Sequence, residues 1–381
     1  MHLTELRLRQ FRNHSDSWFD FGDGTNILLG DNGQGKTNVI EAISYLCLTR
    51  SFFATNDALA VQFENPLFEI EGTFVADSTV KYNVRVAYDV RQEEKLCTIN
   101  RHPVEPFSTI IGKFPVIICA PEHAPITSEG PFERRKFVDF VLSQSYPAYF
   151  QHLLEFRKIL KQRNKILLDG KLSKMDCSKL LIPWNEQLVT HGSFLIMRRK
   201  QFVDEFQTCI QSAYRHVAGE GERPHMEYVP QCSLDQIDDE QNVRAALMAD
   251  LEKKHDSELR YGITLVGPHR DEFGMKINGL DIRKFASQGQ HKTFLVALKI
   301  GEFFYLKDRC NETPIMLLDD IFSELDSSRS SRLLQFVETL SQTFITSTNR
   351  QIFEENAEFG GRNKLFTIQN GTVVQQSSLA V

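Results

Sequence analysis

The sequence predicts an α/β fold in which both ends of the chain build one domain around an inserted helical lobe. Strand patterns fill the first 130 residues and return after residue 260, whereas residues 131–260 show helical periodicity almost throughout. We therefore expect residues 1–130 and 261–381 to form one discontinuous domain, and residues 131–260 to form the lobe.

The first 130 residues predict a β-rich region. Residues 3–11, 67–75 and 80–90 alternate between polar and apolar side chains, which is typical of strands with one buried face. Short apolar runs at residues 26–29 and 115–119 indicate strands that are buried on both faces. Both kinds of strand are therefore expected in this region.

The central part of the chain is predicted to consist of amphipathic helices. Apolar side chains recur at helical spacing through residues 137–160 and 188–206. Residues 219–239, with several glycines, prolines and acids, interrupt this pattern before a last helix at residues 243–254. A helical stretch between two strand-rich parts indicates an insertion.

The last part of the chain returns to mixed strands and helices. The predicted strands are residues 263–266, 273–277, 315–318 and 343–346. Asn278 and Gly279 form a dipeptide that is typical of a tight hairpin turn. A helix is expected at residues 288–306, and the polar tail at residues 375–378 is expected to fray.

Composition excludes several classes of protein. The longest apolar runs, such as residues 315–318, are far shorter than the ~18 residues that a bilayer-spanning helix needs. The N-terminus lacks the basic start and apolar stretch of a secretory signal, and the seven cysteines include no Cys-x-x-Cys pair. The sequence therefore predicts a cytoplasmic protein without disulfide bonds or a zinc site.

The charge is distributed unevenly along the chain. The net charge of -6, taken alone, argues against a partner as acidic as DNA. Residues 131–200, however, carry 14 Lys and Arg against 6 Asp and Glu, whereas residues 201–260 carry 6 against 13. Solvated helix faces and DNA-binding surfaces both show such blocks, so charge leaves the two interpretations open.

A glycine-rich segment matches the phosphate-binding loop G-x-x-x-x-G-K-[ST], between the predicted strand at residues 26–29 and a predicted helix at residues 36–48. Its members are Gly30, Asp31, Asn32, Gly33, Gln34, Gly35, Lys36 and Thr37. Backbone N–H groups and the helix N-terminus would bind phosphate oxygens, Lys36 would meet the β and γ phosphates of ATP, and Thr37 would ligate Mg²⁺. A chance match in a glycine-rich turn is the alternative.

Two carboxylates follow the predicted strand at residues 315–318. Asp319 would hold the Mg²⁺ shell, and Asp320 would orient or deprotonate the attacking water, so Asp320 is the predicted catalytic residue. Any apolar strand that ends in Asp shows the same pattern, so the pattern alone does not identify a nucleotide site. The presence of the phosphate-binding loop in the same chain favours the nucleotide site for Asp319 and Asp320.

Two further short motifs flank this strand and match the signature and D-loop of ABC-type ATPases. They are Ser287-Gln288-Gly289-Gln290 and Ser323-Glu324-Leu325-Asp326. In those ATPases the signature of one subunit contacts the γ phosphate bound to another. When Ser287, Ser323 and Asp326 are considered separately, the alternative role for each is to cap a helix.

Together these motifs make the whole chain resemble the RecF family of recombination mediators, which are relatives of SMC heads. The resemblance also rests on Phe11-Arg12-Asn13, Thr37-Asn38, Glu41-Ala42, Ala120-Pro121-Glu122, Glu133-Arg134-Arg135 with Phe137 and Asp139, and Gly267-Pro268-His269-Arg270-Asp271. The chain departs from ABC transporters at Ser347-Thr348-Asn349, where those proteins have a switch histidine. The γ-phosphate sensor therefore has no assignment.

The resemblance implies an ABC-type ATPase head, called lobe I, with the helical lobe II inserted into it. It implies a protein that binds ATP and Mg²⁺, dimerises around two nucleotides, and clamps DNA at single-stranded gaps or at single/double-strand junctions without reading sequence. Hydrolysis would be slow and stimulated by DNA. RecR and RecO would be partners, and recombinase loading and SOS induction would follow.

In the resembling fold, lobe II flanks the DNA cleft, so its cations become candidate phosphate contacts. These are Arg134, Arg135, Lys136, Arg157, Lys158, Lys161, Arg163 and Lys165. Alternatively, Arg134 and Arg135 brace the lobe through salt bridges to its acidic half, residues 201–260. An alternative interpretation of the whole chain is a P-loop phosphotransferase that acts on a small molecule. A third class, a chromosome-organising head, would need a longer coiled coil than residues 131–260 provide.

Overall fold

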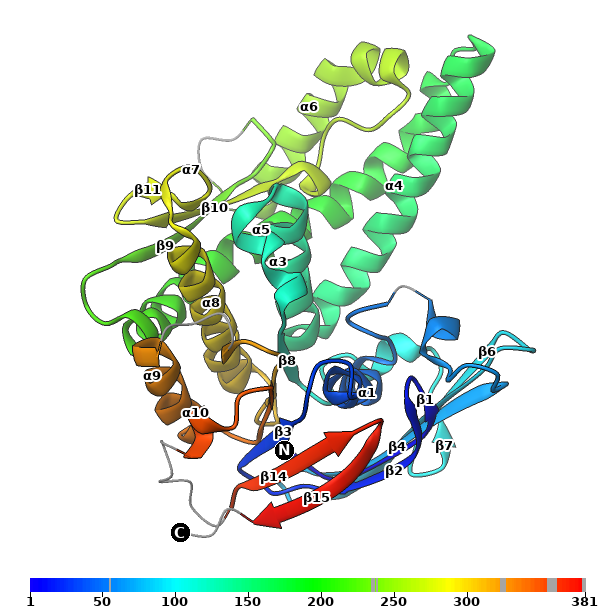
Figure 1. Ribbon diagram of the computed structural model, residues 1–381. Coiled ribbons are helices and arrows are strands. Elements are labelled where there is room, and N and C mark those ends of the chain that lie inside the picture. Colours follow the sequence, from blue (N-terminus) through cyan, green and yellow to red (C-terminus); the bar gives the residue numbers. More distant parts are fainter. Residues whose placement is uncertain (55, 234–236, 238, 323–326, 355–361, 379–381) are drawn as a thin grey trace. The chain divides into compact units, whose positions relative to one another are not determined.

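The computed structural model (Figure 1) describes all 381 residues except 55, 234–236, 238, 323–326, 355–361 and 379–381. The chain divides into two compact units, which are described separately. The first unit contains Met1–Ala124, Ser212–Gly221 and Ser287–Val381, and the second contains Pro125–Gln211 and Glu222–Ala286.

These bounds differ from the predicted domain bounds by a few residues at 125–130, and by more in two other places. Residues 261–286, expected to belong to the first domain, belong to the second unit, because β10 (Glu272–Ile277) pairs with β9 (Pro224–Val229). Conversely, Tyr214 belongs to the first unit, where its ring packs edge-on against Phe294. Pairing between distant segments, which local periodicity does not report, sets both bounds.

An antiparallel sheet of six strands occupies one part of the first unit, in the order β2-β1-β4-β5-β6-β7. Its strands are β1 (His2–Phe11), β2 (His14–Asp20), β4 (Leu67–Val75), β5 (Lys81–Asp89), β6 (Glu94–Ile99) and β7 (His102–Pro103). In β1 the side chains of Leu6 and Leu8 are fully buried, while those of Glu5, Arg7 and Arg9 are more exposed, as the alternation predicted.

A second sheet of six strands follows the order β15-β14-β3-β13-β12-β8 and is parallel except for β15. Its strands are β3 (Thr25–Leu29), β8 (Val116–Cys119), β12 (Ile315–Leu318), β13 (Thr343–Ser347), β14 (Lys364–Gln369) and β15 (Thr372–Ser378). The strands β3, β8, β12 and β13 are buried along their whole length, which explains the continuous apolar runs of β8 and β12 and the apolar end of β3. The expectation that residues 375–378 fray is wrong, because they pair with β14.

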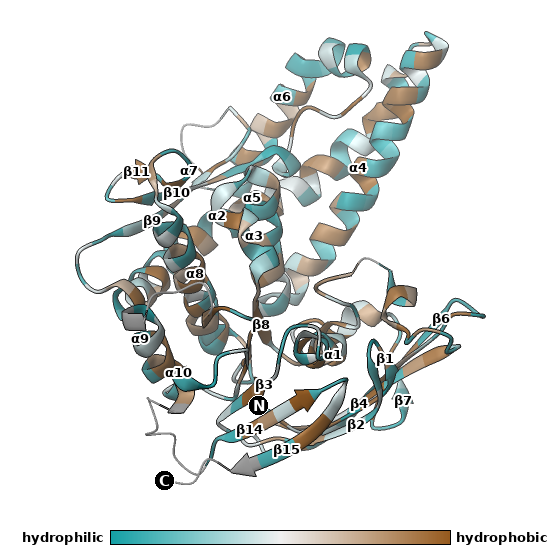
Figure 2. Cartoon of the chain, in the orientation of Figure 1, coloured by the Kyte–Doolittle hydropathy of each residue, from teal (hydrophilic) through white to brown (hydrophobic). Residues whose placement is uncertain are grey.

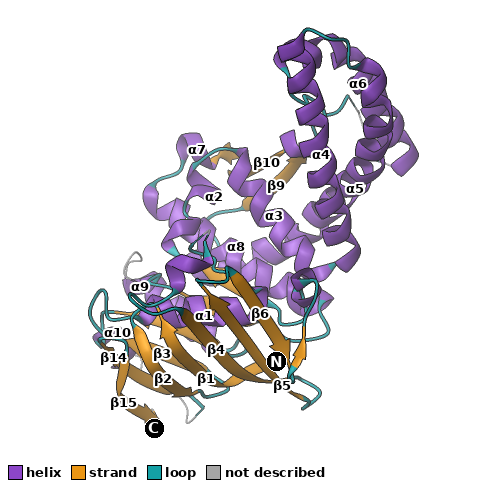
Figure 3. Ribbon diagram, turned by 90° about the vertical axis from the view of Figure 1, so that its right-hand side faces the viewer, coloured by secondary structure: helices purple, strands orange, loops and turns teal. Residues whose placement is uncertain are grey.

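Helix α1 (Lys36–Leu48) lies between the two sheets of the first unit, where it contacts β4 and β5 of one and β13 of the other. Figure 3 shows α1 close to β4. The other helices of this unit are α8 (Gln288–Arg309), α9 (Ser327–Glu338), α10 (Gln351–Glu354) and the 3₁₀ helices η1 (Asp57–Ala60), η2 (Phe107–Ile110) and η3 (Pro121–His123). Helix α1 is almost wholly buried, as its apolar composition predicted.

The second unit is mainly helical. Its helices are α2 (Pro125–Ser128), α3 (Pro131–Ser145), α4 (Pro147–Ser173), α5 (Ser178–Ala218, whose last turns belong to the first unit), α6 (Glu240–Tyr261), η4 (Pro268–Arg270) and α7 (Ile282–Phe285). Figure 2 shows hydrophobic and hydrophilic residues alternating along α4. The first four buried residues of this helix are Tyr149, Leu153, Phe156 and Ile159. The long helices of the lobe are therefore confirmed.

The second unit also contains a small sheet that the sequence only partly predicted. β10 forms the expected hairpin with β11 (Leu280–Asp281) through Asn278 and Gly279, both at positive φ. β9 was not predicted, and residues 263–266, predicted to be a strand, are not one. Among the described residues, no helix has the length and apolarity that crossing a bilayer requires.

Candidate nucleotide-binding site

A glycine-rich loop joins β3 to α1, where the sequence placed the phosphate-binding motif. Gly30, Gly33 and Gly35 have φ angles of 154°, 77° and 107°, which favour glycine. A Cβ atom at Gly30 would lie 2.4 Å from the carbonyl oxygen of Ile368, and one at Gly35 would lie 2.5 Å from Oδ1 of Asn13. Close approach and backbone conformation therefore both require glycine at these two positions.

The turn between β1 and β2 holds this loop. Asn13 Nδ2 donates to the carbonyl oxygen of Gly33 at 3.3 Å, and Asn13 Oδ1 accepts from Asn38 Nδ2 at 2.7 Å. The buried His14 ring places Nε2 3.1 Å from the carbonyl oxygen of Gly35, and burial lowers the pKa of this histidine. The loop is thereby tied to the antiparallel sheet.

The turn between β14 and β15 holds the loop from a distant part of the chain. Asn370 and Gly371 have φ angles of 48° and 70°, and their N–H groups donate to Oε1 and the carbonyl oxygen of Gln34 at 2.6 and 2.9 Å. A Cβ at Gly371 would lie 2.0 Å from the carbonyl oxygen of Asn13. Sequence reasoning missed this brace. The Asn-Gly dipeptide signals a turn, but no local pattern signals a contact across 336 residues.

The Lys36 side chain folds back into the loop. Its Nζ donates to the carbonyl oxygens of Gly30 and Asp31, at 2.8 Å each. Burial lowers the pKa of Lys36, and the charges of Asp320 and Asp319 partly offset that effect. A cation beside the backbone N–H groups of such a loop is suited to bind a phosphate group.

Asp319 lies at the end of β12, next to the first turn of α1. Its Oδ1 accepts hydrogen bonds from Thr37 Oγ1 at 3.0 Å and from Thr346 Oγ1 at 2.7 Å. Burial raises the pKa of Asp319, and the charges of Glu122 and Asp320 add to the rise, while the two hydroxyl groups oppose it. A nearby cation would favour the carboxylate, and a threonine hydroxyl beside one carboxylate is a donor set that Mg²⁺ takes together with phosphate oxygens.

Asp320 follows with a φ of 49°, a left-handed conformation that is uncommon for a residue other than glycine. Its N–H donates to Thr346 Oγ1 at 2.9 Å, which orders the turn after β12. The structure thus brings Asp320 and Asp319 together beside the loop, as the sequence predicted for the pair. The D-loop positions Ser323 and Asp326 lie outside the described residues.

The predicted signature stands at the N-terminus of α8. Ser287 caps this helix: its Oγ accepts from the N–H of Gln290 at 3.2 Å, and Gln290 Oε1 accepts from the N–H of Ser287 at 2.9 Å. Ser287 and Gln288 are exposed, and the carbonyl oxygen of Gly289 accepts from Arg329 Nη1 at 3.3 Å. The capping alternative is therefore present in the single chain, and the exposed helix end is also open to a second molecule.

Arg12, which the sequence left without a role, has a clear partner. Its guanidinium binds Glu41 of α1 through two hydrogen bonds of 2.8 and 2.6 Å, and its Nη1 donates to the carbonyl oxygen of Leu59. The motifs Phe11-Arg12-Asn13 and Glu41-Ala42, which both contribute to the family resemblance, are therefore joined by one ion pair.

Comparisons with known proteins identify the family. The sequence matches the family described as RecF/RecN/SMC N terminal domain over residues 2–372. It is 41% identical over 369 residues to the DNA replication and repair protein RecF of Salinibacter ruber, covering 94% of this chain and 88% of that protein. It is 40% identical to the RecF protein of Chloroherpeton thalassium, covering 93% and 97%. This chain belongs to the RecF family.

Solved structures of other proteins support the same family assignment. A structure of the recombination mediator protein RecF-ATP in the RecFOR pathway matches with a TM-score of 0.89 at 30% identity, covering 99% of this chain and 97% of that one. The corresponding RecF-ATPrS structure matches with a TM-score of 0.88. An SMC head bound to the C-terminal winged helix of ScpA matches at 0.57 with 13% identity, which supports the fold alone. The predicted fold class, an ABC-type ATPase head with a helical lobe, is confirmed.

Two of the predicted DNA contacts of this RecF-family chain need correction. Arg134 is 1% exposed and binds both carboxylate oxygens of Glu272, at 2.9 and 3.1 Å. Arg163 is fully buried and pairs with Glu258, which is also fully buried. Since both guanidinium groups are enclosed and matched by carboxylates, they are not available to a DNA phosphate. Arg134 does form a bracing salt bridge, but its partner Glu272 lies outside the acidic half of the lobe, residues 201–260, that the alternative named.

The remaining cations of the lobe differ among themselves. Arg135 is half-buried and donates to the carbonyl oxygen of Asp271 at 2.7 Å, and burial lowers its pKa. Lys158 is exposed and pairs with Glu155 at 2.7 Å one turn earlier, Lys161 is exposed, and Arg157 is exposed although it pairs with Asp139 at 3.3 Å. The accessible positive charge of α4 therefore includes Arg157 and these two lysines.

A buried charge network in the second unit was missed by sequence reasoning. Arg199 binds Asp139 at 2.8 Å and Asp271 at 2.9 Å, and its Nη1 also donates to the carbonyl oxygen of Pro268 at 2.6 Å. Burial raises the pKa of Asp271, against the effect of Arg199. The Pro-His-Arg-Asp stretch of the family motif is thus anchored by a structural ion network.

Proposed function

We propose that this protein is an ATP-hydrolysing, DNA-binding protein of recombinational repair and replication. The observation that carries the proposal is the group of Thr37, Asp319 and Thr346, which lies at the carboxyl ends of parallel strands beside a phosphate-binding loop. Nucleotide sites of open α/β sheets lie at this edge. RecF relatives named as DNA replication and repair proteins, and a RecF-ATP structure, support the same function.

The residues of the site divide the work of nucleotide binding and hydrolysis. Gly30, Gly33 and Gly35 let the loop N–H groups face the phosphates, and Lys36 supplies a positive charge. Thr37 and Asp319 would hold Mg²⁺, whose charge neutralises the phosphate oxygens. Asp320 would orient or deprotonate the attacking water.

Dimerisation would complete the site. The exposed Ser287 and Gln288 at the start of α8 offer a helix N-terminus and a hydroxyl group, a second anion-binding element beside the phosphate-binding loop of another subunit. Two such contacts would enclose two ATP molecules between two chains. Hydrolysis would then release the pair.

The DNA contacts of the proposed clamp rest on exposed cations. Lys136, Arg157, Lys158 and Lys161 present charge from α3 and α4, and contacts to phosphates would give binding that is independent of sequence. Family resemblance supplies the finer proposals: binding at gaps or junctions, slow hydrolysis stimulated by DNA, RecR and RecO as partners, recombinase loading and SOS induction.

Hydrolysis and dimerisation assays test the site residue by residue. We expect Lys36→Ala to abolish nucleotide-driven dimerisation, and Ser287→Arg to block dimerisation while each chain still binds ATP. Asp320→Asn should bind ATP and dimerise but turn over poorly. Normal dimerisation of Ser287→Arg would overturn the contact between subunits, and hydrolysis at the unmodified rate by Asp320→Asn would remove that residue from catalysis.

The phosphotransferase alternative makes a different prediction. It requires phosphate transfer from ATP to a small acceptor, with no effect of DNA on the rate. Family membership favours the DNA-binding function over this alternative.

A further inference from the structure

One end of the second unit carries an exposed apolar surface. It is formed by the end of α4, the start of α5 and the end of α6. Seven large apolar side chains there are exposed and together are called the tip patch: Leu168, Leu172, Met175, Leu180, Ile182, Tyr261 and Ile263. Leu172 and Met175 are 72% and 71% exposed. Clusters of this kind on a soluble protein mark interaction sites more often than single exposed residues do.

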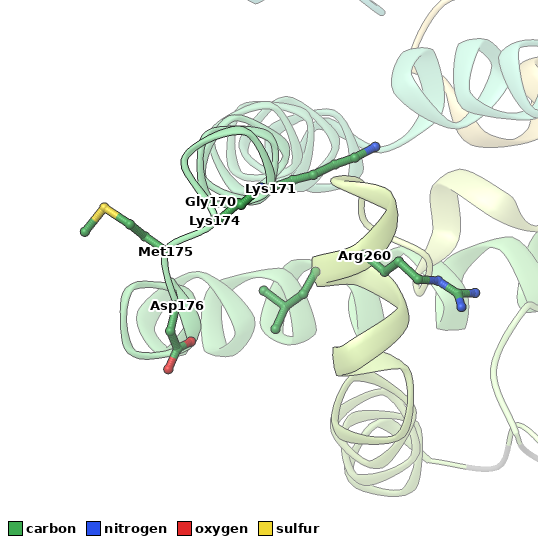
Figure 4. A pocket seen from close by; sticks show the side chains of 7 residues that line it. Gly170, Lys171, Lys174, Met175, Asp176 and Arg260 are labelled. Atoms are coloured by element: carbon green, nitrogen blue, oxygen red, sulfur yellow. The ribbon is translucent and has the colours of Figure 1, made fainter.

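The tip patch rests on an ordered base and includes a depression. Leu167, Cys177 and Leu181 form a small buried cluster under it. A pocket of about 440 Å³ opens beside this cluster and is lined by Gly170, Lys171, Lys174, Met175, Asp176, Leu259 and Arg260. Figure 4 shows Met175 on the turn between α4 and α5, and Lys171 and Arg260 projecting from their two helices. The surface therefore offers an open depression, beside Met175 and Leu259, into which an apolar side chain can pack.

The rim of this pocket is positively charged. Lys171, Lys174 and Arg260 line it, and none of the three forms an ion pair in the described ranges. Lys171 Nζ donates to the carbonyl oxygen of Tyr261 at 3.2 Å, and Arg260 Nη2 donates to the Tyr261 hydroxyl at 2.7 Å, so neither contact neutralises the charge. The one acid of the lining, Asp176, accepts hydrogen bonds from the N–H and hydroxyl groups of Ser178. Cations at the ends of α4 and α6 also suit the helix dipoles, but that role does not explain the exposed apolar side chains.

We propose that the tip patch binds a segment of a partner protein that carries apolar side chains flanked by carboxylates. Apolar anchors would cover Leu172 and Met175 and enter the pocket, and the carboxylates would meet Lys171, Lys174 and Arg260. This site goes beyond the proposed function and needs neither ATP nor DNA.

Other occupants fit less well. DNA would use the cations but leave the leucines and the methionine in water. A second copy of this chain, related by a twofold axis, would place the patch against itself and bring its lysines close to one another. An acidic, apolar protein segment matches both properties of the surface at once.

A peptide-binding experiment on the full-length protein tests this proposal. The probe is a fluorescein-labelled peptide of alternating Leu, Phe, Asp and Glu, and its control has Lys in place of every acid. Fluorescence polarisation should show saturable binding of the acidic peptide alone, weaker at high salt. Leu172→Asp with Met175→Asp should weaken binding at least about tenfold, and Lys171→Glu with Lys174→Glu should do the same.

Matched controls separate the site from general effects. Leu280→Asp changes an exposed apolar residue on β11, outside the tip patch, and should bind the acidic peptide normally. Circular dichroism spectra and urea unfolding midpoints should be unchanged in all three variants, which shows that they are folded. The proposal would be overturned if both peptides bound equally, or if Leu280→Asp lost as much peptide affinity as the patch variants. It would also be overturned if the patch bound anionic phosphatidylserine vesicles in place of the peptide, or self-associated without binding the peptide.

Discussion

Two groups of cations in the second unit have different roles, although the sequence presents them alike. Arg134, Arg163 and Arg199 are at most 2% exposed, and each is held by a carboxylate from a distant part of the chain. Lys158 and Lys161 face solvent on α4. The positive excess of residues 131–200 therefore consists of one part that holds the fold and another part that is free to attract a polyanion.

Breaking a buried pair should have the largest effect. Arg163→Met leaves Glu258 charged and enclosed without its cation, which costs about 3–5 kcal/mol of unfolding free energy. Lys161→Met, two residues earlier on the exposed face, should change it by less than about 0.5 kcal/mol. Urea unfolding followed by circular dichroism measures both. Equal losses would contradict the division between the two groups.

Burial should also make stability depend on pH through His269. Burial lowers the pKa of His269 to about 4, and its Nε2 lies 3.2 Å from the carbonyl oxygen of Thr264. Because the folded state favours the neutral ring, its stabilising contribution is present above the unfolded pKa of about 6.5 and is lost as the pH falls through about 4.

The loss should reach about 3 kcal/mol, and His269→Gln should flatten that part of the pH profile. The exposed His225 is the matched control: His225→Gln should leave the profile as it is. Unfolding free energies from pH 7 to pH 4 check this expectation. Identical profiles for wild type and His269→Gln would show that this ring does not carry the pH dependence.

The exposed lysines should affect DNA binding without affecting stability. Lys158→Ala with Lys161→Ala should lower affinity to a similar degree for all sequences and reduce the slope of log K against log salt by about 2. Arg134 is unsuitable for this test because its loss would disturb Glu272. An unchanged slope would exclude these two lysines from the DNA surface.

The smallest effect concerns the double role proposed for Ser287. Ser287→Ala removes the cap of α8 and should cost about 1 kcal/mol of unfolding free energy. Ser287→Asn retains a capping side chain and should preserve that stability. Loss of ATP-driven dimerisation in the stable Asn variant would then report on the contact between subunits, whereas retention in both variants would leave Ser287 a cap alone.

Local features of the sequence predicted much of the first unit. The alternation of residues 3–11 and 67–75, and the apolar runs of β3 and β12, depend on which faces of a strand are covered, so they appear directly in the sequence. The phosphate-binding loop was predicted for the same reason, because its motif stands between a strand and a helix.

Features set by distant contacts could not be predicted. Residues 263–266 have strand-like composition, but the N–H and hydroxyl groups of Thr264 are bound by Oδ1 of Asn164 on α4, 100 residues away. Helical periodicity likewise places Arg163 on α4 without revealing that Glu258 encloses it. The contact of Gly371 with Gln34 is another pairing of this kind.

The most direct test of the central claim is DNA binding titrated against salt, with and without ATP, on one purified sample. An ATP-driven clamp should bind DNA only with ATP, lose affinity steeply as salt rises, and lose binding in Lys36→Ala. Binding that is indifferent to ATP, or no binding at any salt concentration, would contradict it.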